Sequence, residues 1–425
     1  MIRAYTYIIY LFIVFLAVAC FKKKSPSAVE PGAHSSATGM KFGKSDSTFH
    51  PDDAVFGQPI VPPNLSPSMV FIEGGKALIG FEELEFTHNK KRSYSATVES
   101  FYMDEAEIAN VHWLEYLFYI RKFSESDYQN ALPDTSVWMR QFSFNDYYVE
   151  NYLRHPAFHF YPVVGVSWLQ ANEYCKWRTD PKAFVKEYEG QYVKKTGTGK
   201  RIQLNDTTWV NEGYRTPVQA KKEKKERPKL PEYRLPTEAE WIYAALTFSY
   251  HDPYVDEKDY YKRIYPWDGS GTRNPYGKSQ GYFFANFKRG RGDYSGVAGM
   301  RNDGAVYTEY IYSNPPNDVG LYNIAGNVNE WVQDLYEYLP QDYELFEFNK
   351  DLTREKKDEY DMDTDNFVEH LEEERYRVYK GGSWNDNAHW LSPFTRRYLT
   401  EDSSASTIGF RCAMSSFVLG QTKLK

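Results

Sequence analysis

The most reactive side chains in the sequence are the cysteines, and Cys20 stands where one specific modification would occur. Arg3 precedes a dense apolar run that begins at Ile8 and ends in small residues, and Cys20 follows directly. Such a run is too short for a permanent membrane helix and is typical of a secretory signal peptide. We predict that residues 1–19 are a lipoprotein signal peptide and that Cys20 carries lipid, such as palmitate. The alternative is an uncleaved or differently cleaved signal with an incidental cysteine.

The stretch behind Cys20 has the composition of a tether. Residues 20–67 contain a run of lysines and many serines and prolines. Such a stretch buries little apolar surface and is typical of a linker. We therefore expect a lipidated flexible tether over 20–67 and a folded body that begins near Ser68.

Length and composition limit the class of protein. The chain has 425 residues, a formal net charge of -7 and 17% aromatic residues. The negative net charge offers no basic stripe for a nucleic-acid backbone, and the aromatic content is far too high for a disordered chain. We expect no nucleic-acid partner and a chain that folds over most of its length.

The densely folded parts of the sequence are the three blocks 68–178, 231–334 and 375–415. Together they have the size of one large core, whereas the stretches between them are rich in charged residues. We predict one domain over 68–415 with surface insertions at 179–230 and 335–374, followed by a C-terminal tail over 416–425. A solvated surface is the expected role of the acidic second insertion, and binding of a basic partner is the alternative.

Two helix starts are marked by a capping box, in which an N-cap side chain and the side chain three places on bond each other's backbone. Ser167 opens one such helix, over 168–178, and Thr237 opens another, over 238–246. A third helix should begin near Asn110, where apolar residues recur at helical spacing. Elsewhere short apolar runs are interrupted by Gly-Gly pairs, which predicts an α+β fold with few regular elements and many loops.

Seven short motifs fall in order along the three blocks: 69–75 (MVFIEGG), 101–105 (FYMDE), 162–168 (PVVGVSW), 234–241 (RLPTEAEW), 326–331 (GNVNEW), 381–384 (GGSW) and 409–411 (GFR). This succession resembles the formylglycine-generating enzyme (sulfatase-modifying factor) superfamily. The resemblance implies the fold of that superfamily, which is C-type-lectin-like, α+β and poor in regular secondary structure.

The enzymes of this superfamily carry two cysteines, five residues apart, after the Gly-Gly-Ser motif, and this pair binds copper. In the present chain those positions hold Asp386 and Leu391. A carboxylate and a leucine cannot supply the thiolate pair that Cu(I) prefers. We therefore expect no copper and predict that the chain is not an enzyme of this kind.

A second class, the iron-dependent sulfoxide synthases, carries an H-x-x-x-H iron motif on a helical domain. His155 and His159 have this spacing, but Pro156 and the aromatic residues around it favour a loop. We expect loop or interface histidines here rather than an iron site.

The third class is non-catalytic. Residues 132–175 and 285–294 resemble the gliding-motility lipoproteins, GldJ most closely and GldK (PorK) next. Those proteins are outer-membrane lipoproteins of the type IX secretion and gliding machinery, and GldK builds a periplasmic ring with GldN. The resemblance implies a structural component with GldK/GldN-like partners and self-association or a ring. An envelope enzyme of the superfamily, or a sugar-binding module with the same fold, is the alternative.

The lysines at 22–24 indicate which face of the membrane carries the anchored chain. Surface-exported lipoproteins of the bacteria that have this machinery tend to carry acidic residues directly after the lipidated cysteine. The resemblance therefore implies that the lipid anchor holds this chain on the periplasmic face of the outer membrane.

A disulfide is also implied by the resemblance. Cys175 and Cys412 occupy positions that are bridged in the formylglycine-generating enzymes, and with Cys20 lipidated they are the remaining pair in an oxidising envelope. Two buried free thiols are the alternative.

The same match implies two sites for structural Ca²⁺, which prefers six to eight oxygen ligands. The first set is the side chains of Asn286 and Asp303 with the carbonyls of Phe287 and Ala305. The second set is the side chains of Asn327 and Glu330 with the carbonyls of Gly326 and Val328. The alternative for the second set is that Asn327 and Glu330 only bond the turn while Trp331 packs in the core.

Overall fold

The computed structural model describes most of the three dense blocks and little outside them. The described residues are 27, 29, 35–38, 66, 68–80, 93–121, 124–141, 144–181, 231–247, 263–289, 305, 307–336 and 375–416. The predicted signal peptide with Cys20, most of the tether, and nearly all of the two insertions and the C-terminal tail lie outside these residues.

The three predicted helices are confirmed. The helix near Asn110 is α2 (Asn110–Arg121), and the two capped helices are α6 (Trp168–Thr179) and α8 (Glu238–Leu246). In α6, the Ser167 hydroxyl accepts the backbone N–H of Gln170 at 3.2 Å, and the Gln170 side chain accepts the backbone N–H of Ser167 at 2.9 Å. Thr237 and Glu240 form the same reciprocal pair at the start of α8. These caps satisfy backbone donors that the first helical turn leaves unpaired.

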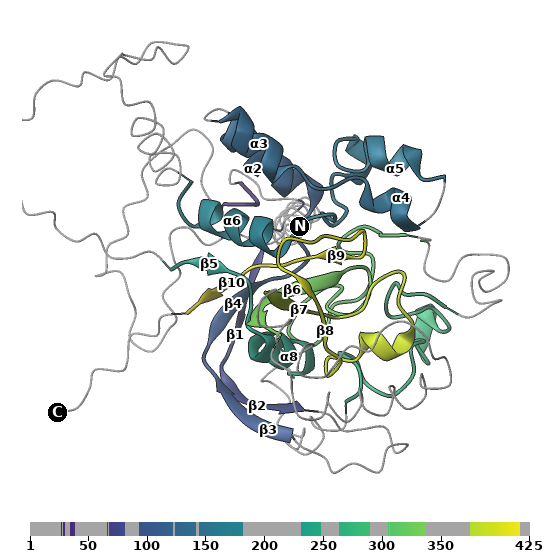
Figure 1. The fold of residues 1–425 in the computed structure, drawn as a ribbon. Helices are drawn as coiled ribbons and strands as arrows, with labels where there is room; N and C mark the ends of the chain where they lie inside the picture. Colours follow the sequence, from purple (N-terminus) through teal and green to yellow (C-terminus); the bar gives the residue numbers. More distant parts are fainter. Residues whose placement is uncertain are drawn as a thin grey trace, which may run out of the picture.

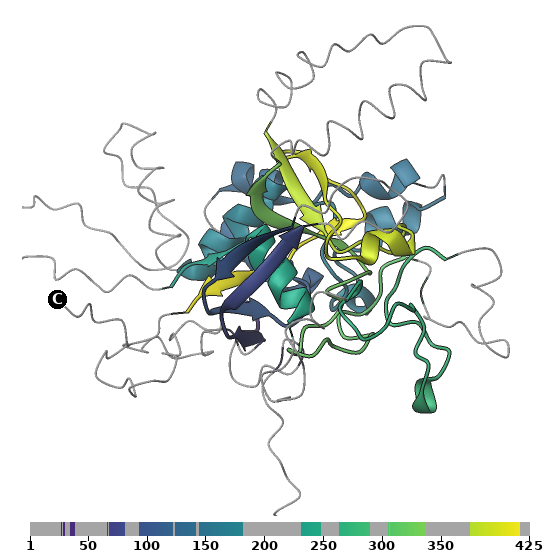
Figure 2. The same ribbon diagram turned by 90° about the horizontal axis from the view of Figure 1, so that it is seen from below.

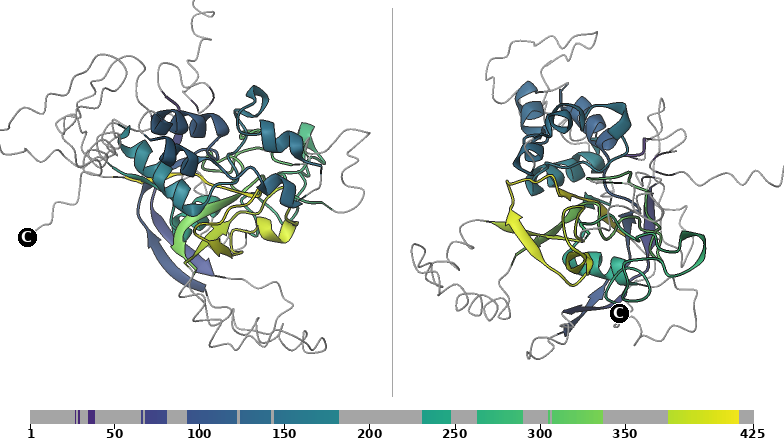
Figure 3. Two further views of the ribbon diagram at one scale, coloured as in Figure 1. Left: turned by 45° about the horizontal axis from the view of Figure 1, so that its top comes forward. Right: turned by 90° about the vertical axis from the view of Figure 1, so that its right-hand side faces the viewer.

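The sequence did not predict the short helices. They are α3 (Glu125–Ala131), α4 (Val137–Gln141), α5 (Asp146–Asn151) and the 3-10 helices η2 (Pro156–Phe158), η4 (Gly277–Ser279) and η6 (Ala388–Leu391). Each is too short to show a helical repeat of apolar residues. Helices α2 to α6 lie together on one side of the sheets (Figure 1 and both views of Figure 3), and η4 lies on an arm that projects from the body (Figure 2).

Two four-stranded sheets and one hairpin make up the strands of the described part. The first sheet has the order β1 (Met69–Ile72), β4 (Phe101–Asp104), β10 (Ala413–Ser415), β5 (Tyr233–Arg234), and its strands are antiparallel. The second has the order β8 (Arg397–Thr400), β7 (Tyr376–Lys380), β6 (Asn329–Leu335), β9 (Ile408–Gly409), in which β6 and β9 are parallel. The hairpin consists of β2 (Gly75–Gly80) and β3 (Ser93–Val98).

The core lies between the helices and the sheets. One cluster of buried side chains joins α2 and α6 to the end of the chain, with Trp113 stacked on Tyr174 at 5.3 Å and edge-on to Phe410 at 5.9 Å. A second cluster lies around Trp241 of α8, which packs against the hairpin and β6. Short strands, short helices and long loops around one continuous body confirm the predicted α+β fold with little regular structure. Within the described residues, no helix combines the length and apolar character needed to cross a membrane.

Candidate functional site

Asp386, which the resemblance sets at the position of the first enzyme cysteine, forms an ion pair. The carboxylate of Asp386 accepts two hydrogen bonds from Arg397, at 2.6 and 2.7 Å, and further bonds from the Ser383 hydroxyl at 2.5 Å and the Asn329 amide at 3.0 Å. Burial by itself raises the pKa of Asp386, but the hydrogen bonds and charge of Arg397 outweigh it and hold this pKa below its usual value. The guanidinium of Arg397 lies 4.4 Å from the ring centroid of Trp390. Asp386 is therefore a charged carboxylate whose oxygens are taken up by donors of the protein.

Leu391, which the resemblance sets at the position of the second enzyme cysteine, is part of the apolar core. Leu391 ends η6, is fully buried and packs in a cluster with Phe283 and Phe287. The backbone around it is tight, because a Cβ on Gly382, whose φ is +72°, would lie 2.9 Å from the carbonyl oxygen of Trp390. Neither Asp386 nor Leu391 offers a free donor atom to a soft metal ion.

The second predicted calcium set does not fit a calcium ion in this arrangement. The two carboxylate oxygens of Glu330 accept hydrogen bonds from Arg411, at 2.6 to 2.9 Å, and from the indole N–H of Trp241 at 2.8 Å. The amide oxygen of Asn327 accepts the backbone N–H of Glu309 at 2.8 Å. These oxygens face protein donors, so a cation bound to them would have to displace the buried guanidinium of Arg411.

Of the first predicted calcium set, Asp303 lies outside the described residues. Asn286 is buried, and its side-chain amide donates to the backbone carbonyl of Tyr307 at 2.7 Å. The backbone carbonyl of Asn286 accepts the backbone N–H of Asn327 at 2.8 Å. Phe287 is buried and Ala305 half-buried. This set stays a prediction. Among the described residues, no three His, Cys, Asp or Glu side chains gather as metal ligands.

The two remaining cysteines lie side by side. Cys175 of α6 and Cys412, just before β10, are fully buried free thiols whose sulfur atoms are 3.5 Å apart. Burial raises the pKa of the Cys175 thiol well above its usual value. The structure thus brings the predicted pair into contact, and the bond between them stays a prediction.

The two histidines of the H-x-x-x-H spacing flank η2. His155 is its N-cap, and its ring nitrogen Nδ1 accepts the backbone N–H of Ala157 at 3.2 Å. The segment is a single 3-10 turn in place of the expected loop and not a long helix, and the expectation that its histidines bind no iron stays a prediction.

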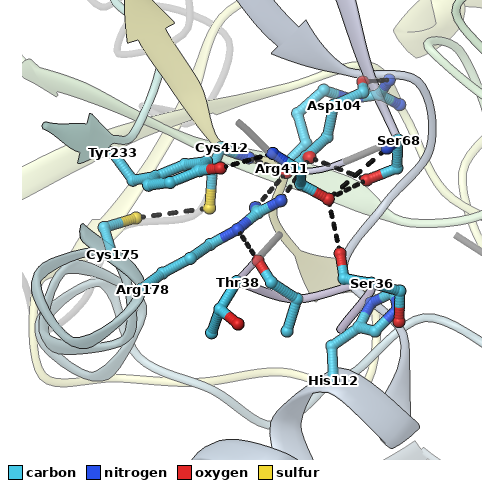
Figure 4. Close-up of polar contacts among 12 residues, drawn as sticks. Ser36, Thr38, Ser68, Asp104, His112, Cys175, Arg178, Tyr233, Arg411 and Cys412 are labelled. Carbon is cyan, nitrogen blue, oxygen red and sulfur yellow. Dashed lines mark hydrogen bonds and ion pairs between the residues drawn. The ribbon is translucent and has the colours of Figure 1, made fainter. Parts of the chain in front are cut away.

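A buried ionic cluster that the sequence did not predict lies beside the cysteines (Figure 4). Arg178 of α6 donates both terminal guanidinium nitrogens to Asp104 of β4, at 2.6 and 2.8 Å, and lies 4.3 Å from the ring centroid of Tyr233. The backbone N–H of Cys412 donates to Asp104 at 3.0 Å. These residues come from helix, strand and chain end, so no local pattern marked them.

The same cluster contacts part of the predicted tether. Residues 35–38 and Ser66 pack on the body, and Ala37 belongs to the core cluster around Trp113. The tether over 20–67 is therefore not free of the body along its whole length. This contact could not be predicted, because residues 35–38 read Ser-Ser-Ala-Thr and resemble any small polar linker.

Comparison with known proteins agrees with this architecture. The model of the FGE-sulfatase family, described as the sulfatase-modifying factor enzyme 1-like domain, matches residues 58–416. Formylglycine-generating enzyme from Mus musculus is 32% identical over 183 residues, which are 42% of this chain and 38% of that protein. The same enzyme from Bos taurus is 24% identical over 90% of this chain and 83% of its own length.

A relative named as inactive has the same sequence identity to this chain as the enzyme from Bos taurus, over most of its own length. Inactive C-alpha-formylglycine-generating enzyme 2 from Mus musculus is 24% identical over 82% of this chain and 86% of that protein. Among solved structures, CarF has a TM-score of 0.40 and 17% identity, covering 82% of this chain and 97% of its own. The family match extends over nearly all of the described residues, and the chain belongs to the FGE-sulfatase family of sulfatase-modifying factor enzyme 1-like domains.

Proposed function

We propose that this chain is a non-catalytic outer-membrane lipoprotein, a structural component of the type IX protein secretion and gliding motility machinery. The proposal that the chain is non-catalytic rests on the residues that stand where the resemblance sets the two enzyme cysteines, which are Asp386 and Leu391. The carboxylate of Asp386 accepts hydrogen bonds from Arg397, Ser383 and Asn329, and the side chain of Leu391 is buried in the apolar core. Copper-dependent oxidation of a cysteine needs thiolate ligands for the metal, and this region supplies none.

The relative named inactive supports this reading, because it is a family member of similar extent whose name denies the activity. It also bears on what the fold is for. Here the two positions hold an ion pair and a buried apolar side chain, and one fold can serve a structural role as well as a catalytic one.

The second half of the proposal rests on the lipoprotein signal before Cys20 and on the resemblance to GldJ and GldK. In that setting the partners are other lipoproteins and ring components of the machinery, GldK/GldN-like proteins or further copies of this chain. Exposed Met139, Phe144 and Tyr147 on and between α4 and α5 support a protein partner, because large apolar side chains dominate interfaces. The lysines at 22–24, directly after the lipidated Cys20, favour the periplasmic face of the outer membrane over the cell surface.

Co-purification tests the structural role. The chain is isolated from solubilised outer membrane, and we expect ring components of the machinery to come with it. Deletion of the gene should abolish secretion of proteins that carry the type IX sorting domain. Complementation with the wild-type gene is the control, and normal secretion in the deletion strain would contradict the proposal.

Absence of the oxidase activity is tested directly. Purified protein is incubated with copper and a cysteine peptide from a sulfatase, beside a formylglycine-generating enzyme as positive control. We expect unchanged peptide. Copper-dependent loss of the cysteine would overturn the non-catalytic assignment and favour an envelope enzyme.

A further inference from the structure

Large apolar side chains are exposed on two separate surfaces of the described part. The first, called the helical face from here on, is formed by α4 and α5 and exposes Phe144 and Tyr147 by 92% and 55%. The second is the arm, defined as residues 272–284, which contains η4 and exposes Tyr276 and Tyr282 by 80% and 44%. Exposed apolar side chains that gather in this way mark binding surfaces.

The helical face is only partly used by the fold of the chain itself. Helix α5 buries none of its six residues. Its half-buried Tyr148 and Val149 pack against the core cluster around Trp138, whereas Tyr147 and the preceding Phe144 stay mostly exposed. Because a helix gains most of its stability from packing an apolar face, the side chains that α5 leaves uncovered are available to a partner.

The arm has a fixed backbone at its tip. The backbone N–H of Asn274 donates to the carbonyl of Tyr282 at 2.8 Å, and the carbonyl of Asn274 accepts the N–H of Gly281 at 2.8 Å. The guanidinium of Arg273 donates to the carbonyl of Gly281 at 2.7 Å, and the side-chain oxygen of Asn274 accepts the N–H of Tyr276 at 2.9 Å. Tyr276 is therefore presented in one backbone conformation before a partner arrives, which lowers the entropic cost of binding.

The two surfaces carry opposite charges. The arm contains two basic residues and no acidic one, whereas α5 contains two acidic residues and no basic one. Lys278 of the arm and Asp146 and Glu150 of α5 are exposed. The basic residue of α4, Arg140, forms an ion pair with Asp134 at 2.8 Å. Complementary charges of this kind fix the orientation of two surfaces and raise the rate at which they associate.

The arm and the helical face point in different directions. In Figure 2 the arm projects from the body away from α4 and α5. A contact between two unlike surfaces of identical chains is head-to-tail, and each copy then keeps one surface of each kind for a further neighbour. Such contacts continue into a ring or a filament.

We propose that the arm of one copy of this chain binds the helical face of a second copy, with Tyr276 against Phe144 and Tyr147 and with Lys278 beside Glu150. The proposal rests on the proposed structural role, and it selects a further copy of the chain among the partners named there. It also assigns the two surfaces that meet.

Sedimentation of the purified full chain, kept in one detergent throughout, tests the contact. Tyr276→Ser alters the arm and Phe144→Ser alters the helical face, and both positions are so exposed that the fold should not change. Phe118→Ser is the matched control, because Phe118 of α2 is 61% exposed and lies on neither surface. We expect wild type and Phe118→Ser to assemble beyond a dimer, and the two other variants to need at least about tenfold more protein. A monomeric wild type, or variants that assemble as wild type does, would overturn the contact.

Mixing the two variants tests whether these surfaces bind each other. Tyr276→Ser keeps an intact helical face, and Phe144→Ser keeps an intact arm. At a concentration where each variant alone is monomeric, an equimolar mixture should form a dimer with one chain of each kind and nothing larger. A mixture that stays monomeric would overturn the pairing of the arm with the helical face.

Charge reversal tests the orientation. Lys278→Glu and Glu150→Lys should each weaken assembly, and the chain that carries both substitutions should assemble more strongly than either single variant. A double variant as weak as the single ones would overturn the proposed pairing of these charges.

The outcome is separate from that of the secretion and co-purification experiments. A chain that co-purifies with ring components but stays monomeric when purified would overturn the contact and leave the proposed function in place. A chain that assembles through these surfaces although its deletion leaves secretion normal would keep the contact and overturn the proposed function.

Discussion

Replacing Arg397 by methionine tests whether the ion pair between Arg397 and Asp386 stabilises the fold. The substitution removes two hydrogen bonds to Asp386 and one, at 2.6 Å, to the side-chain oxygen of Asn329. The side chains of Arg397 and Asp386 are 22% and 14% exposed, which places the pair between the exposed and the buried case. Exposed pairs contribute about 0 to 1 kcal/mol, and breaking a buried one costs about 3 to 5 kcal/mol. We expect Arg397→Met to lower the free energy of unfolding by about 2 to 4 kcal/mol at pH 7.

The contribution of this ion pair to the free energy of unfolding depends on pH. Because the pKa of Asp386 is lower in the folded protein than in the unfolded chain, its contribution is present above the unfolded value and is lost as pH falls through the folded one. Arg397→Met removes the largest contribution that lowers this pKa, whereas the hydrogen bonds from Ser383 and Asn329 remain. The difference in unfolding free energy between wild type and variant should therefore be largest near pH 7 and shrink as pH falls toward and below the unfolded aspartate pKa of about 3.9.

Urea unfolding followed by tryptophan fluorescence measures both quantities. Arg140→Met is the control, because Arg140 pairs with Asp134 at 2.8 Å where the side chains are 62% and 38% exposed, and it should cost less than about 1 kcal/mol. A loss in Arg397→Met no larger than in Arg140→Met, or a loss that persists unchanged in acid, would refute the reasoning.

Three further results are expected. Thiol counting in denaturant without reductant should find Cys175 and Cys412 bridged in protein taken from the envelope, with a stabilisation of at most about 5 kcal/mol for so long a loop; two reactive thiols would contradict the bridge. Cys20→Ala should move the protein from the membrane to the soluble fraction of cells, and a variant found wholly in the membrane fraction would contradict the anchor. Strong chelation should lower the melting temperature of wild type but not of Asn286→Ala if the first calcium set binds its ion, and an unchanged wild-type melt would count against it.

Local signals account for the parts of the fold that the sequence predicted. Ser167 and Thr237 marked α6 and α8 because both partners of a capping box lie within four residues of sequence. The short helices α3 to α5 were not predicted, because they bury too few residues to show a helical repeat of apolar side chains, and α5 buries none. Their positions are set by tertiary contacts, which a pattern along the chain does not contain.

The site shows the same division. The prediction that Asp386 and Leu391 stand at the enzyme cysteine positions came from counting along the sequence from a motif, but the ion pair between Asp386 and Arg397 could not be predicted in that way. The ionic cluster could not be predicted either, because Arg178 donates to a carbonyl 141 residues away in the sequence and Asp104 accepts from an amide 308 residues away. Contacts of this kind depend on the finished topology.

The place of β10 in the first sheet has a consequence for when the protein can fold. Ala413 pairs with Met103 of β4 on one side and with Arg234 of β5 on the other, so nearly the last described residues form an inner strand. Until these residues are available, β4 lacks one neighbour and β5 lacks its only partner in the sheet. Strands that pair across such a separation form slowly and leave open edges meanwhile. A chain that ends before Ala413 would leave the edges of β4 and β5 open, and proteases and chaperones would recognise it as incompletely folded.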